Sequence, residues 1–147
     1  MKIAIEIACR YLASIAGALV IQFLIFAICG EELLANEKAS VNVSHAALFS
    51  LLVAIPILES GLALAIFSAV RKSSSNVGAA LVSTFLVFVL AHGMFSWIWA
   101  LTIAPLAGVS AHAFAIPRRL LVSAVVIFAV HFLFNMTGYM LRQTFST

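Results

Sequence analysis

The stretch YLASIAGALVIQFLIFAIC, residues Tyr11–Cys29, decides the fold class, because it carries no charged side chain over the length of a membrane crossing. A transmembrane helix needs about 20 consecutive, mainly apolar residues. Three further, mainly apolar runs of similar length follow, at residues 46–70, 78–100 and 120–141. The sequence therefore predicts an all-α, polytopic integral membrane protein, built as a bundle of four transmembrane helices.

The composition supports this prediction. Of the 147 residues, 65% are hydrophobic and only 9% are charged, whereas an ordinary soluble domain is about 45–50% apolar and about 25% charged. The polar surface is too small to cover a water-soluble globule, and the length suits a single membrane domain over residues 1–147. No basic cluster indicates nucleic acid, so the expected partners are the lipid bilayer and a membrane protein or peptide.

One apolar segment does not fit the span pattern. LTIAPLAGVSAHAFAIP, residues 101–117, contains Pro105, Gly108 and Pro117. It either extends the third span or forms a broken or re-entrant element packed against the bundle, because irregular backbone at membrane depth must be covered by protein. Both alternatives remain open from the sequence.

The charges indicate an orientation, because cytoplasmic loops carry an excess of Lys and Arg. Four spans place both termini on one side. That side carries Lys2, Arg10, Arg71, Lys72 and Arg142. The other side carries Lys38, Arg118 and Arg119. We therefore expect both termini in the cytoplasm and a bacterial inner (plasma) membrane, with Trp97 and Trp99 in the aromatic belt of the outer face.

Three ionisable residues interrupt the predicted spans: Glu59, His92 and His131. Counted at about 1.5 Å per helical residue, Glu59 lies about 18 Å from Arg71, and His131 lies about 17 Å from Arg142. His92 lies about 21 Å from the start of its span, so all three sit near the middle of the membrane. Charged groups at this depth are costly and usually face the protein interior. We expect them to converge.

These side chains predict specific chemistry. Glu59 and His92 can hold and deprotonate a water as paired general bases. His131, with Asn135 one helical turn further, can donate hydrogen bonds to an oxyanion. Two alternatives remain: the histidines can join helices by hydrogen bonds, or ligate a haem in pairs. The sequence has no other pattern for a cofactor and no metal-ligand spacing, so no cofactor or metal is expected.

Two short motifs carry a family resemblance. FVLAH, Phe88–His92, matches an FxxxH pattern, and HFLFN, His131–Asn135, matches HxxxN, both downstream of Glu59. This resembles the CPBP superfamily of CAAX-protease and bacteriocin-processing intramembrane peptidases, also called the Abi family. The resemblance implies that Glu59 and His92 activate water, and that His131 and Asn135 form the oxyanion hole.

The chain also departs from the family pattern. The first motif of the family is EExxxR, whereas this chain reads ESGLAL, with Ser60 and Leu64 at the second and last positions. The family also implies a further span between the FxxxH and HxxxN motifs. A degenerate, short relative therefore remains an alternative to a peptidase. A third hypothesis is a non-enzymatic accessory subunit of a larger membrane complex, or an immunity or exclusion protein.

Overall fold

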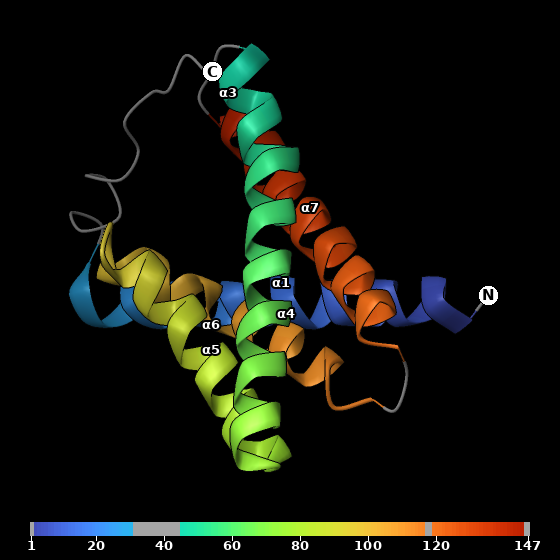
Figure 1. The fold of residues 1–147 in the computed structure, drawn as a ribbon. Helices are drawn as coiled ribbons and strands as arrows, with labels where there is room; N and C mark the ends of the chain where they lie inside the picture. The colour runs from blue at the N-terminus through green and yellow to red at the C-terminus, as the bar shows by residue number, and fades with distance from the viewer. Residues whose placement is uncertain (1, 31–44, 117–118, 146–147) are drawn as a thin grey trace.

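The computed structural model describes residues 2–30, 45–116 and 119–145, and every regular element in these ranges is a helix (Figure 1). The long polar segment 31–44, with Lys38, and Arg118 between α6 and α7 lie outside these ranges. The elements are α1 (Lys2–Cys29), α3 (His45–Phe49), the π-helical turn η1 (Ser50–Ala54), α4 (Ile55–Ser74), α5 (Val77–Gly93), α6 (Trp97–Ala113) and α7 (Leu120–Phe145). The prediction of an all-α fold is confirmed.

Three helical stretches are long and apolar enough to cross a membrane: Lys2–Cys29, Ala46–Ser74 and Leu120–Leu141. The second of these joins α3, η1 and α4 into one continuous rod. Helices α5 and α6 are also apolar but have only 17 residues each. The helices thus support a membrane protein, with three full-length candidate spans and two shorter apolar helices.

The third expected span, residues 78–100, is divided in the structure. Helix α5 ends at Gly93, and α6 begins at Trp97 after the extended backbone of Ser96. The Ser96 hydroxyl accepts a hydrogen bond of 3.2 Å from the N–H of Trp99, which caps the new helix. The segment 101–117, for which the sequence left open an extension of the third span or a broken or re-entrant element, continues this helix to Ala113, with Pro105 inside it.

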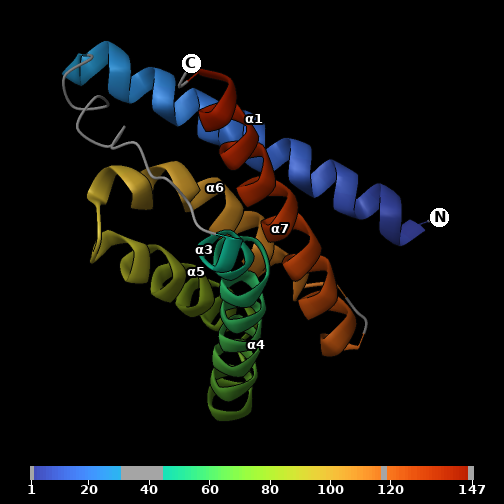
Figure 2. The ribbon, with the colours of Figure 1, turned by 90° about the horizontal axis from the view of Figure 1, so that it is seen from above.

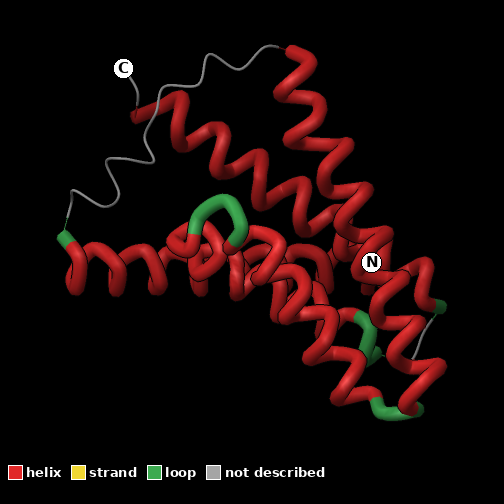
Figure 3. The backbone as a smooth tube through the Cα atoms, turned by 60° about the vertical axis from the view of Figure 1, so that its left-hand side comes forward, coloured by secondary structure: helices red, strands yellow, loops and turns green. Residues whose placement is uncertain are grey.

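Helices α5 and α6 form a hairpin, as the short loop between them in Figure 3 shows. Phe114, just after α6, stacks on Phe67 near the end of α4, with 4.9 Å between ring centroids. Ala80, in the first turn of α5, belongs to the same buried cluster. The connection after α6, with Arg119, therefore lies at the same end of the bundle as Arg71.

This arrangement differs from the expected one, in which Arg119 and Arg71 lie on opposite sides. The difference arises because α6 is an intact return helix rather than an extension of α5. The C-terminal end of α7, which carries Arg142, lies at the opposite end from the α4–α5 turn (Figure 1).

Helices α6 and α7 lie between α1 on one side and α4 with α5 on the other (Figure 2). The backbones of α1 and α6 approach closely, because a Cβ added to Gly17 would lie 2.6 Å from the Cβ of Pro105. Tyr11 and Thr137 share a 2.6 Å hydrogen bond between their hydroxyl oxygens, which joins α1 to α7. This packing leaves one face of α7 against α4, where the polar residues meet.

Candidate functional site

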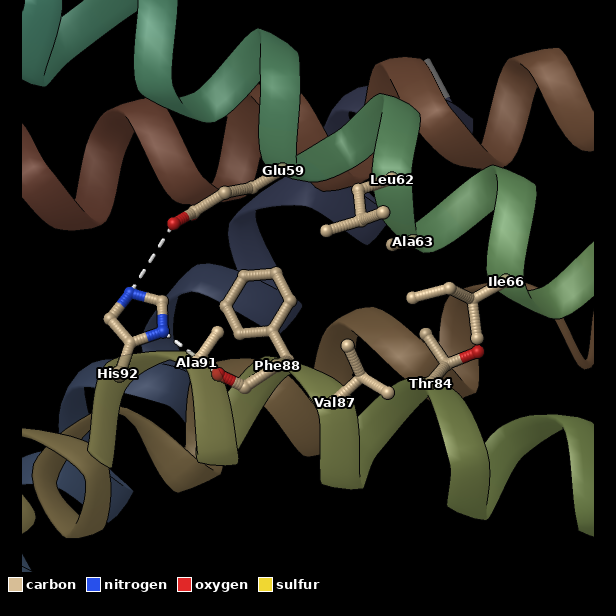
Figure 4. A pocket seen from close by; sticks show the side chains of 9 residues that line it. All are labelled: Glu59, Leu62, Ala63, Ile66, Thr84, Val87, Phe88, Ala91 and His92. Carbon is tan, nitrogen blue, oxygen red and sulfur yellow. Dashed lines mark hydrogen bonds and ion pairs between the residues drawn. The ribbon is translucent and has the colours of Figure 1, made fainter. Parts of the chain in front are cut away.

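Three polar side chains from three helices converge at the junction of α4, α5 and α7. Glu59 lies in α4, His92 in the last turn of α5 and His131 in α7. One carboxyl oxygen of Glu59, Oε1, lies 3.4 Å from His92 Nε2, and the other, Oε2, lies 3.1 Å from His131 Nδ1. The carboxyl group is therefore held between two imidazole rings. Figure 4 shows it reaching from α4 towards His92.

The orientation of His92 is set by its own helix. Its Nδ1 donates a hydrogen bond of 2.8 Å to the carbonyl of Phe88, since a carbonyl oxygen can only accept. The Phe88 ring stacks on the imidazole, with centroids 5.3 Å apart. Trp99 meets the same imidazole edge-on at 5.2 Å. In the neutral ring, Nε2 is therefore the basic nitrogen, and it faces Glu59.

His131 is more deeply enclosed than His92. It is 4% exposed, and the Phe88 ring lies 5.8 Å from its imidazole, measured between centroids. Its Nδ1 and the Oε2 atom of Glu59 are close, yet both are buried without an aligned hydrogen bond. Buried polar atoms normally have partners, because leaving them unpaired is costly. The carboxyl group and the imidazole thus lie within ion-pair distance of each other, without an aligned hydrogen bond between them.

A cavity of about 30 Å³ lies between α4 and α5 beside this cluster (Figure 4). Glu59 and His92 are among the residues that line it, but the exposed wall is almost entirely apolar. This volume is enough for about one water molecule. Two of the lining side chains, Leu62 and Val87, are 51% and 38% exposed. The cavity is therefore close to the outer surface of the α4–α5 pair.

Asn135, the fourth residue of the expected site, has a different partner. Its Nδ2 donates a hydrogen bond of 2.9 Å to the carbonyl oxygen of Leu51 in η1. The structure thus brings Glu59, His92 and His131 together, while the amide of Asn135 is engaged with the backbone of a neighbouring helix.

Sequence reasoning assigned Trp99 to the membrane interface only, and it missed the contact of this residue with His92. No spacing rule could have found that contact, because it depends on the hairpin between α5 and α6. The contact with Leu51 did have a signal, since Pro56 inside an apolar span removes an N–H and leaves a carbonyl to be satisfied.

The cluster does not fit a haem bound by both histidines. The carboxyl group of Glu59 occupies the space between Nε2 of His92 and Nδ1 of His131, where the macrocycle would have to lie. Among the residues that the structure describes, no group of three His, Cys, Asp or Glu side chains is arranged to hold a metal ion.

Compared with protein-family models, with curated proteins and with solved structures, the chain matches none of them. The arrangement of Glu59, His92 and His131 therefore carries the functional argument.

Proposed function

We propose that this protein is an intramembrane hydrolase that uses Glu59 and His92 to activate water against an amide bond of a membrane-embedded peptide. One observation carries the proposal: the Glu59 carboxyl lies 3.4 Å from His92 Nε2 and 3.1 Å from His131 Nδ1, beside a cavity of about 30 Å³. Three costly polar groups are thereby gathered in one place, and two of them, Glu59 and His92, also line a space of the size of one water.

The reaction follows from these positions. Glu59 and the Nε2 atom of His92 take a proton from the water, whose oxygen attacks the carbonyl carbon of the amide. The C–N bond then breaks, and the same proton passes to the leaving amine. His131, which faces the second carboxyl oxygen, holds Glu59 in place during both steps. The products are a new carboxyl group and a new amino group.

The resemblance to CPBP peptidases supports this proposal. The FxxxH phenylalanine, Phe88, contacts both imidazoles, which gives that position a physical role. Helix α6 lies between the helices that carry the two motifs, where the family implies a further span. Ser60 stands in place of the second glutamate of the family motif. A degenerate relative without activity is therefore the alternative that the activity test can reveal.

Access to the site would come from the lipid. The cavity wall includes the exposed apolar side chains of Leu62 and Val87, and such side chains suit contact with acyl chains or with an apolar peptide. A substrate could enter between α4 and α5 without first leaving the membrane. The proposed partner is therefore a transmembrane peptide or the spanning segment of a membrane protein.

We further propose that α5 and α6 both cross the membrane, instead of the single third span of a four-helix bundle. A length of 17 residues is at the short end of the range for a span, about 17–25 residues. One side then carries Lys2, Arg10, Arg71, Lys72, Arg118 and Arg119. The other carries Lys38 and Arg142, with the acidic Glu31, Glu32 and Glu37.

This distribution follows the positive-inside rule better than the four-span alternative does, because it gathers most of the cations on one side. It places the N-terminus in the cytoplasm and the C-terminus on the opposite side. In the four-span alternative both termini are cytoplasmic. The resemblance to a family that includes bacteriocin-processing peptidases favours the inner membrane of a bacterium for either topology.

The test of hydrolysis uses the full chain in vesicles of phosphatidylethanolamine and phosphatidylglycerol. Quenched fluorogenic transmembrane peptides with alanine, leucine or phenylalanine at the centre serve as substrates. We expect cleavage by the wild type and a loss of about 10²–10⁴-fold in Glu59→Gln. Ser73→Ala, at an exposed hydroxyl far along α4, is the matched control. Absence of cleavage of every peptide, or equal cleavage by Glu59→Gln, would instead favour a non-enzymatic subunit.

A further inference from the structure

The π-helical turn η1 leaves one backbone carbonyl without a main-chain donor. The N–H of Ile55 bonds to the carbonyl of Ser50, five residues earlier, as a π-helix requires. The next carbonyl in this pattern belongs to Leu51, and its partner would be the N–H of residue 56. Residue 56 is a proline, which has no N–H. The Leu51 carbonyl therefore needs a donor from elsewhere.

Asn135 on α7 supplies that donor. Its Nδ2 lies 2.9 Å from the Leu51 carbonyl oxygen. Within an apolar span, water is not available to satisfy a free carbonyl, so the donor must come from the protein. The amide and the carbonyl thus complete each other at the contact between α7 and the rod that continues into α4.

The same two helices hold the polar cluster. Asn135 is one helical turn from His131 on α7, on the same face. Leu51 and Glu59 lie on the same rod, on either side of Pro56. A π turn adds one residue to the helix, which rotates everything after it by about 100° relative to an uninterrupted α-helix. The turn therefore sets the direction in which Glu59 points.

We infer that Asn135 is a positioning residue, which replaces the N–H that Pro56 lacks and so holds Glu59 against His131 and His92. This role differs from that of an oxyanion donor. Its effect on turnover rests on the proposed function, whereas its effect on the π turn does not.

A double-mutant cycle tests the inference in the full-length protein in vesicles. Asn135→Leu keeps the branched shape and the number of side-chain heavy atoms and removes the donor, and Pro56→Ala restores a backbone N–H that can bond to Leu51. We expect Asn135→Leu to lower the midpoint of thermal unfolding by about 2–4 °C. We expect the unfolding midpoint of the double variant, Pro56→Ala with Asn135→Leu, to lie within about 1 °C of the midpoint of Pro56→Ala alone. Pro105→Ala, which restores an N–H in α6, should not rescue.

Two further readouts separate positioning from general stability. The ¹⁵N signals of His92 and His131 should shift in Asn135→Leu and return in the double variant, because both imidazoles face Glu59. Turnover should fall about tenfold in Asn135→Leu and recover with Pro56→Ala. If Asn135→Leu cannot be purified, recovery of folded protein in the double variant supports the inference, and its failure contradicts it.

The contrary result is a loss of turnover in Asn135→Leu with an unchanged unfolding midpoint, unchanged histidine signals and no rescue by Pro56→Ala. Asn135 would then act on the substrate directly. If even the wild type fails to cleave the peptides, the proposed function fails, while the unfolding and ¹⁵N measurements still decide the role of Asn135.

Discussion

His92 donates its Nδ1 proton to the carbonyl of Phe88 over 2.8 Å, and this bond leaves Nε2 as the nitrogen that faces Glu59. A general base needs its basic atom directed at the reaction and its other nitrogen held by a fixed partner. Here the partner is a main-chain atom of the same helix. The FxxxH spacing supplies it, because residue 88 is one turn before residue 92.

Substitution of His92 should separate the structural role of Nδ1 from the catalytic role proposed for Nε2. His92→Asn can place an amide near the position of Nδ1 and retain a hydrogen bond to Phe88, but it has no base at the position of Nε2. We expect nearly wild-type thermal stability with a loss of about 10²–10⁴-fold in cleavage of the fluorogenic peptides. His92→Leu should lose both thermal stability and peptide cleavage. Retention of activity in His92→Asn would remove His92 from the mechanism.

Phe88 should affect the site through packing alone. Its ring stacks on His92 at 5.3 Å and lies 5.8 Å from His131, so Phe88→Leu would loosen both imidazoles. We expect a lower turnover number, because both imidazoles lose a packing partner. Phe132→Leu, in the separate Phe128–Phe132 pair, is the matched control. Equal losses in the two variants would show a general packing effect.

Gly17 should be intolerant of any side chain. A Cβ there would lie 2.6 Å from the Cβ of Pro105, whereas a Cβ at Gly61 would have no atom within 4 Å. Overpacking costs about 1–3 kcal/mol. Gly17→Ala should therefore lower the unfolding midpoint in detergent, and Gly61→Ala should leave it unchanged or raise it. Equal midpoints would contradict the close approach of α1 and α6.

The hairpin predicts the membrane topology. The test uses a chain with Cys9 and Cys29 replaced by serine and a single cysteine at Ser75 or at Ala115. Both cysteines should react with an impermeant maleimide from the same side, because the stacking of Phe67 on Phe114 brings the ends of α4 and α6 together. A reporter fused after residue 147 should report the opposite side. Labelling of the two cysteines from opposite sides would restore the four-span arrangement.

The helical fold could be predicted from the sequence because hydropathy over about 20 residues measures the length of a span directly. The meeting of Glu59, His92 and His131 could also be anticipated, since counting residues along each span gives depth. Counting gives no direction around the helix axis, however. Asn135 shares a face with His131, yet its amide bonds to Leu51.

The division of the third span was not predicted, because the Gly93–Ser96 region is as apolar as its surroundings. Only the capping hydroxyl of Ser96 marks the start of α6. Pro105 left two alternatives open from the sequence, an extended span or a broken segment. Helix α6 continues through Pro105, and the proline ring packs against the bare backbone of Gly17. Tertiary contact therefore decided a point that local propensity could not.

The origin of the oxygen in the product tests the central claim most directly. Peptide cleavage by the vesicle-bound protein is carried out in H₂¹⁸O, and the new C-terminus is analysed by mass spectrometry. The account predicts one ¹⁸O atom in that carboxyl group for the wild type, and a loss of labelled product of about 10²–10⁴-fold in Glu59→Gln. No labelled product from the wild type, or equal amounts from Glu59→Gln, would contradict it.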